Sequence, residues 1–227
     1  MIDWQNIGTA AVVAPHPDDE ILGCGGTIAR LVDAGTDVHA VIMTKGQPPL
    51  FDEKWVETVR TETLNAHRYL GITDTHFLDL PAAELDQVGQ ARINAALAGH
   101  LDRIAPDLLF VPFVGDIHLD HQIAFNAAMV WARPRGPSAP KMVLAYETLS
   151  ETNWLAPGIT PAFNPNCYID IGDRIDKKIA AFEHFESQVQ ESPDERSPET
   201  IRALATVRGS TVYHDFAEAF MVVRIAL

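Results

Sequence analysis

A chain of 227 residues with 47% hydrophobic and 21% charged side chains is long enough to bury a full core, which excludes an intrinsically disordered protein. Its formal net charge of -14 argues against binding to nucleic acid or to an anionic membrane surface, because both would repel an acidic protein. We therefore expect one domain over residues 1–227 that acts on a neutral or cationic small molecule, either as a single chain or as a homo-oligomer.

Short apolar runs alternate with longer segments of helical periodicity along the first two-thirds of the chain. The expected strands are rich in Val, Ile, Leu and Phe, and are Ala10–Ala14, Val38–Met43, Thr75–Leu78, Leu108–Phe113 and Met142–Tyr146. Three helices with a glycine or proline near their ends lie between strands, at Pro17–Ala34, Lys54–Leu70 and Ala91–Ile104. The pattern predicts an α/β fold built from βαβ units around a mainly parallel sheet.

The last third of the chain is expected to contain loops, two helices and a final strand. Clusters of proline and glycine predict surface loops at Ala132–Pro140 and Leu155–Pro165. Helices are expected near Asp173–Gln188 and Pro198–Gly209, and the last strand near Phe220–Ile225. These segments would add to a doubly wound sheet of order 3-2-1-4-5, in which strands one and four are neighbours.

An acidic motif with one histidine, Pro15-His16-Pro17-Asp18-Asp19-Glu20, follows the first expected strand. If the chain enters its helix at Pro17, His16 and Asp19 lie on one face and could both bind a metal ion, whereas Asp18 points elsewhere. A free carboxylate beside a metal-activated water is suited to general-base catalysis. The alternative is that the three acids only complement the positive end of the helix dipole, although that leaves His16 unexplained.

The same helix contains an unusual glycine run, Gly23-Cys24-Gly25-Gly26. Glycine costs about 1 kcal/mol relative to alanine inside a helix, so the run indicates close backbone packing or the approach of a ligand. Its position inside the helix makes it weak support for a nucleotide site. Cys24 is more often a small packed residue than a zinc ligand in such a setting.

A second cluster, His118-Leu119-Asp120-His121, follows the fourth expected strand. If strands one and four are neighbours, one of the two histidines joins His16 and Asp19, and the other faces the same cavity to protonate a leaving group or stabilise an oxyanion. Asp116, Asp120 and Asp79 could orient ligands or bind substrate hydroxyls, though each is individually more often a loop residue or cap. The histidines without a partner at ligand spacing are expected to be structural, and are His39, His67, His76, His100, His184 and His214.

The cysteines and the N-terminal segment bear on the cellular compartment. Cys24 and Cys167 are far apart and form neither a CxxC motif nor a disulfide framework, so both are expected to be reduced. Residues 1–6 lack the basic flank and apolar core of a signal peptide, and no apolar run reaches membrane-spanning length. We expect a cytoplasmic protein with no transmembrane segment.

These motifs together resemble the LmbE-like family, also called the PIG-L-type N-acetylglucosaminyl deacetylases. The stretch Pro15–Thr27 is similar to the family's HPDDE signature, and His118–His121 looks like its HxxH element. Shorter similarities extend over nearly the whole chain, at Arg60-Thr61-Glu62, Phe77–Pro81, Tyr146–Ser150, Phe163–Asn166, Arg208-Gly209 and Ala217–Phe220.

The resemblance implies a fold, an activity and a set of site residues. The fold would be a Rossmann-like three-layer sandwich with the 3-2-1-4-5 sheet and C-terminal additions, and the activity a zinc amidase that removes acetyl groups from N-acetylated amino sugars. By similarity, the zinc ligands would be His16, Asp19 and His121. The general base would be Asp18, and His118 would stabilise the oxyanion or protonate the leaving group. The sugar contacts would be Arg60 and Asp79.

Two other functions are compatible with the same residues. The cluster could hold magnesium or manganese in a phosphoester hydrolase, since carboxylates also suit hard divalent ions. A binding domain with a structural metal is the weaker alternative, because structural zinc sites usually have four protein ligands, often including cysteine, and only three are evident here.

Overall fold

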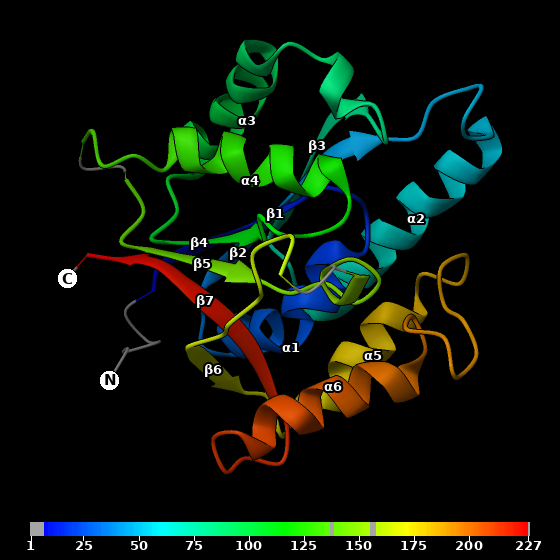
Figure 1. Cartoon of the computed structure of the whole chain (residues 1–227), viewed down its shortest axis with the longest axis vertical. Helices are drawn as coiled ribbons and strands as arrows, with labels where there is room; N and C mark the ends of the chain where they lie inside the picture. The colour runs from blue at the N-terminus through cyan, green and yellow to red at the C-terminus, as the bar shows by residue number, and fades with distance from the viewer. Residues whose placement is uncertain (1–6, 137–138, 155–157, 227) are drawn as a thin grey trace.

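The protein is organised around one seven-stranded sheet of order β3-β2-β1-β4-β5-β7-β6 (Figure 1). The computed structural model describes residues 7–136, 139–154 and 158–226. The strands are β1 (Thr9–Ala14), β2 (Asp37–Lys45), β3 (Asp74–Pro81), β4 (Leu108–Pro112), β5 (Met142–Tyr146), β6 (Cys167–Asp170) and β7 (Ala217–Ile225). The first five are parallel, and β7 pairs antiparallel with both β5 and β6. The predicted order and mainly parallel sheet are therefore confirmed.

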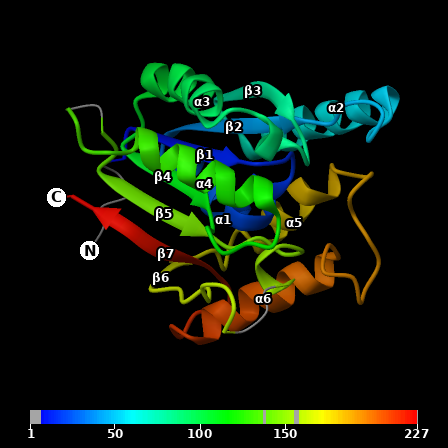
Figure 2. The same ribbon diagram turned by 45° about the horizontal axis from the view of Figure 1, so that its top comes forward.

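Helices cover both faces of the sheet, which gives the predicted three-layer sandwich (Figures 1 and 2). The helices are α1 (Asp19–Asp33), α2 (Glu53–Leu70), α3 (Gln90–Ile104), α4 (Leu119–Trp131), α5 (Ile175–Glu183) and α6 (Pro198–Ser210). Alternate strand residues enter two separate cores: Val12 packs with α1, α2, α5 and α6, whereas Val13 packs with α3 and α4. Burial on both faces is why β1, β4 and β5 are almost entirely apolar.

The first predicted helix starts two residues too early. The chain does not become helical at Pro17 but at Asp19, because Asp18 adopts a left-handed backbone with φ of 100° at the N-cap. His16 lies in a bend and Pro17 with Asp18 in a turn before the helix, so the spacing of His16 and Asp19 arises from this non-helical segment and not from one helical face. The far end agrees with expectation, since Gly35 takes the positive φ of 87° that ends the helix.

Helix α4 and strand β6 are not predicted by the sequence, and the end of α5 differs from its predicted position. Helix α4 is apolar around most of its circumference, so its sequence lacks the one-sided periodicity that predicts a surface helix. Strand β6 has only four residues and follows a proline-rich segment. Helix α5 ends at Glu183 and not near Gln188, and residues 184–197 form turns instead.

The two predicted loops lack helices where the structure describes them. Residues 132–136 and 139–140 form turns, bends and irregular backbone, and residues 158–165 contain a turn and an isolated bridge at Thr160. Residues 137–138 and 155–157 of these loops lie outside the described residues. Within the described ranges, no helix is long and apolar enough to cross a membrane, and both cysteines are free thiols.

The glycine run of α1 is a site of close packing, as one of its two interpretations predicts. A Cβ atom on Gly23 would lie 2.3 Å from the ring of Tyr146, and one on Gly26 would lie 2.7 Å from Ile171. The buried ion pair of Lys178 and Glu218 also reaches the backbone here, with Lys178 Nζ donating to Leu22 O and Gly26 N–H donating to Glu218. These contacts connect α1 to β5, α5 and β7.

We predict that Gly23→Ala destabilises the protein by about 1–3 kcal/mol, because the added methyl group must displace the buried ring of Tyr146. The matched control is Gly99→Ala on α3, where no atom lies within 4 Å of the new methyl group. This control should stabilise the chain by about 0.5–1 kcal/mol, since alanine is the better helix former. Urea unfolding measures the free energy of unfolding of both variants. If the two substitutions change it equally, close packing of Gly23 against Tyr146 is not the cause.

Candidate active site

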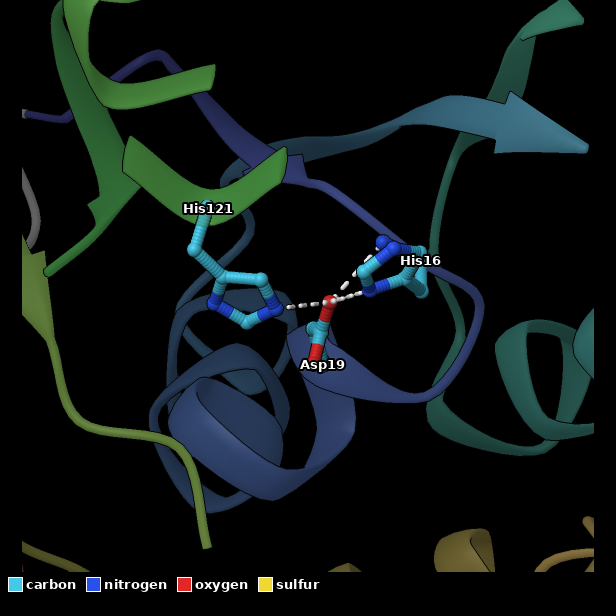
Figure 3. A group of neighbouring side chains, drawn as sticks. All are labelled: His16, Asp19 and His121. Carbon is cyan, nitrogen blue, oxygen red and sulfur yellow. Dashed lines mark hydrogen bonds and ion pairs between the residues drawn. The ribbon is translucent and has the colours of Figure 1, made fainter. Parts of the chain in front are cut away.

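Two loops that are distant in sequence meet at one edge of the sheet. Strands β1 and β4 are neighbours and parallel, so the segments that follow them emerge side by side. His16 and Asp19 come after β1, and His121 lies in the first turn of α4, after β4. Their ligand atoms lie within 4.8 Å of one another (Figure 3). The structure thus brings together the three residues that the resemblance implies as metal ligands.

The carboxylate of Asp19 is the centre of this group. Its Oδ2 atom lies 3.4 Å from His16 Nδ1 and 3.2 Å from His121 Nε2, and accepts a 2.8 Å hydrogen bond from His16 N–H (Figure 3). Burial opposes ionisation of Asp19, but the two imidazoles hold its pKa well below the usual range. A fully buried carboxylate is therefore kept negative between two histidines.

Each of these imidazoles is oriented by a second carboxylate. His121 Nδ1 lies 2.8 Å from Asp116 Oδ2, and His16 Nε2 lies 3.0 Å from Asp120 Oδ2. Although burial lowers both values, these carboxylates and Asp19 raise the pKa of His16 to about 9 and that of His121 well above the usual range. A carboxylate behind each imidazole is the arrangement that orients histidine ligands of metal ions.

The donor set fits a divalent metal ion. The Nε2 atom of His121 is fully buried and makes no hydrogen bond within the described residues, although it faces Asp19. Two imidazole nitrogens and one carboxylate oxygen form a ligand set that zinc takes in catalytic sites, with a position left for water. The same edge of the sheet holds a second overlapping group, which is His16, His118 and Asp120.

Asp18 lies next to the metal-ligand group but outside it. Its Oδ2 atom accepts a 3.0 Å hydrogen bond from Arg196, while the buried Oδ1 finds no hydrogen-bond partner among the described residues. Burial raises the pKa of Asp18 to about 7, against the lowering effect of the Arg196 guanidinium. A carboxylate with a pKa near neutrality can exchange a proton at the pH of the cell.

His118 is the N-cap of α4 and stands beside the same group. Its ring centroid lies 4.5 Å from that of His16, and its Nδ1 accepts a hydrogen bond from Asp120 N–H. Burial and the neighbouring His16 lower the pKa of His118, which favours the neutral ring. Because Nδ1 is an acceptor, the proton of the neutral ring is on Nε2, where it can be donated to a ligand.

A cavity of about 230 Å³ opens directly over these residues. His16, Asp18 and His118 line its polar side, and an apolar wall faces them, formed by Phe51, Trp55, Val56, Val59 and Phe77. Arg60 and Asp79 lie at this cavity and form an ion pair of 2.9 Å, with Arg60 4.0 Å above the ring of Phe77. The cavity has the mixed polar and apolar lining of a small-molecule site.

Residues 11–132 match the PIG-L family, which is described as GlcNAc-PI de-N-acetylase. The chain belongs to the PIG-L family. This confirms the resemblance expressed by the HPDDE and HxxH motifs, both of which lie within the matched residues.

Among the relatives of this PIG-L chain is the diacetylchitobiose deacetylase of Thermococcus kodakarensis, which is 28% identical over 97% of this chain and 85% of the relative. The fold is shared with the N,N'-diacetylchitobiose deacetylase of Pyrococcus horikoshii, with a TM-score of 0.79, 22% identity, and 97% of this chain and 85% of that chain covered. The fold is also shared with GalB, the 4-carboxy-2-hydroxymuconate hydratase of Pseudomonas putida KT2440, with a TM-score of 0.78 and 20% identity. That match covers 97% of this chain and 98% of GalB. The fold alone therefore does not determine the reaction.

Arg196 and Glu151 line the candidate site although no sequence motif indicates them. Arg196 comes from the irregular segment between α5 and α6, and Glu151 follows β5 and lines the cavity. Neither residue belongs to the two histidine motifs: Glu151 comes 30 positions after His121, and Arg196 comes 75 positions after it. No local signal could have found them, because only the tertiary fold brings them to the site.

We predict that Glu151→Gln changes how stability depends on pH. Burial raises the pKa of Glu151 to about 7, so the folded protein binds this proton more tightly than the unfolded chain. The wild type should lose stability from about pH 4.5 to pH 7, and the variant should become more stable relative to it by about 1 kcal/mol across that range.

Urea unfolding in the presence of a chelator at pH 4.5 and pH 8 measures this difference. The matched control is Glu186→Gln, which replaces an exposed glutamate. A pH-independent effect of Glu151→Gln would contradict the burial account.

Proposed function

We propose that the chain is a zinc-dependent N-deacetylase that hydrolyses the acetamide group of an N-acetylated amino sugar. The observation that carries the proposal is the arrangement of Asp19 between His16 and His121, with Asp18 beside them, whose Oδ1 makes no hydrogen bond within the described residues. Membership of the PIG-L family and the activity of the chitobiose deacetylase relative support the same reaction.

His16, Asp19 and His121 would hold the zinc ion. Two imidazole ligands favour zinc over magnesium or manganese, which prefer oxygen ligands, and this argues against the phosphoester hydrolase alternative. When bound, zinc would polarise the acetyl carbonyl and lower the pKa of a water molecule. Asp116 and Asp120 would hold the two imidazoles in the orientation that this requires.

The other residues of the site would move the protons. Asp18 would accept the proton of the attacking water through Oδ1, while Arg196 holds Oδ2 in place. His118 would donate a hydrogen bond from Nε2 to the oxyanion that develops on the acetyl oxygen. Asp18 would then return the proton to the sugar nitrogen as the amide bond breaks, which gives acetate and a free amine.

The sugar would occupy the cavity with its acetamide toward Asp18. Arg60 and Asp79 offer charged hydrogen-bonding groups to its hydroxyls, and the aromatic wall offers an apolar surface for the ring face. We also propose that residues 1–227 act as one domain, because β5, β6 and β7 complete the sheet that begins in the matched region.

We predict that Asp18→Asn lowers kcat by about 10²–10⁴-fold without loss of zinc, because the variant loses the base but no ligand. Asparagine tolerates the left-handed backbone at this position, so the fold should be preserved. Acetate release from a panel of N-acetylated sugars, together with elemental analysis, measures both properties.

Asp215→Asn, in an exposed turn, is the matched control and should keep both activity and zinc. Full activity of Asp18→Asn would remove Asp18 as the base. If the wild type releases no acetate from any sugar in the panel but cleaves phosphoesters, the deacetylase assignment fails.

We predict that Asp116→Ala weakens zinc binding by about 10–100-fold, because His121 loses the carboxylate that orients it. Competition with a chromogenic chelator measures the affinity, with Asp215→Ala as the control. An unchanged affinity would show that the ring of His121 is held by its packing alone.

A further inference from the structure

A second group of histidine and carboxylate side chains lies away from the active site. His39 is on β2, and Asp74 and His76 are on the neighbouring edge strand β3. Strand pairing places His39 directly opposite Asp74, and His76 follows two positions later on the same face of the sheet. Asp74 begins β3, so the group lies toward the amino ends of the strands, whereas the active site follows their carboxyl ends.

The distances within this group suit one metal ion. His39 Nδ1 lies 3.1 Å from His76 Nε2, and His76 Nε2 lies 3.7 Å from Asp74 Oδ2. Ligand atoms about 2.0–2.1 Å from a tetrahedral zinc ion are separated by about 3.3 Å, so these spacings need little adjustment. One ligand atom from each residue can be chosen so that all three lie within 4.8 Å of one another.

The carboxylate of Asp74 and the imidazole of His76 have local contacts that favour metal binding. Asp74 Oδ1 accepts a 2.8 Å hydrogen bond from Thr75 N–H, which turns Oδ2 toward His76. Burial, together with His39, His100 and Arg103, lowers the pKa of His76. The direction of this shift favours the neutral ring, which is the form that binds a metal ion.

A hydrogen bond between the two imidazoles is the simpler interpretation of their 3.1 Å contact. It accounts for His39 and His76 but not for the carboxylate held beside them. His100 of α3 adds a third imidazole, with its ring 5.3 Å from that of His76, although its Nδ1 is engaged by Arg103. Three elements thus direct metal-binding side chains to one place.

We propose that His39, Asp74 and His76 form a second site for a divalent transition-metal ion of the zinc class, which joins the edge strand β3 to β2. Zinc has the required preference for imidazole nitrogen and carboxylate oxygen, and the exposure of Asp74 leaves the fourth position to water. The site would stabilise the fold, because an ion bound only by the folded chain raises its stability.

Zinc titration by calorimetry tests the proposal in a His16→Ala/His121→Ala background, from which two of the active-site ligands are missing. We expect this variant to bind one Zn²⁺ per chain and to melt at a higher temperature when Zn²⁺ is added. Adding His76→Gln should remove most of that binding, since one of the three protein ligands is lost. His184→Gln, a histidine outside both groups, is the matched control and should change nothing.

The wild type provides an independent count of sites. It should bind two Zn²⁺ ions, and His39→Gln and His76→Gln should each bind one and retain their far-ultraviolet circular dichroism. A background variant that binds no Zn²⁺, or binds it equally well after His76→Gln, would overturn the proposal. Loss of deacetylase activity bears only on the active site, so the two proposals can fail separately.

Discussion

The parallel pairing of β1 with β4 is the constraint on which the site depends. It places side by side two loops whose residues His16 and Asp120 are 104 positions apart in sequence. The imidazoles of His16 and His121 lie on either side of Asp19 and stabilise its negative charge. Each imidazole also contacts a second carboxylate on its other side, Asp116 for His121 and Asp120 for His16. Positive and negative groups therefore alternate outward from the Asp19 carboxylate.

Two consecutive aspartates have opposite acid–base character in this arrangement. Both are buried, and burial raises the pKa of each. Asp19 faces two histidines, which more than reverse this effect, whereas Asp18 faces one guanidinium, which only reduces it. The left-handed backbone of Asp18 directs the two side chains to different partners, so a single turn separates a permanent anion from a group that exchanges its proton.

The central part of the fold could be predicted because its signals are local. Strands buried on both faces form apolar runs, and β1, β4 and β5 were located within about one residue for that reason. The two histidine motifs were also visible as short patterns. Helix α4 lacked one-sided periodicity, and the start of α1 depends on a backbone conformation of Asp18 that its residue type merely permits. Arg196 and Glu151 reach the site through the tertiary fold, so their positions depend on contacts that no local window contains.

The contact of Arg196 with Asp18 has a consequence for how such a protein could evolve. The region that matches the family ends at residue 132 and includes the group of His16, Asp19 and His121. Three residues that contact the site or its supporting strand come later, and they are Tyr146, Glu151 and Arg196. Tyr146 donates a hydrogen bond to Val13 O at the end of β1 and packs on Gly23 of α1. The first half of the chain thus carries the recognisable signature, while residues of the second half contact the same site. Recombination at that boundary would separate Asp18 from the guanidinium that holds its Oδ2 atom, so a chain recombined there would lose this contact.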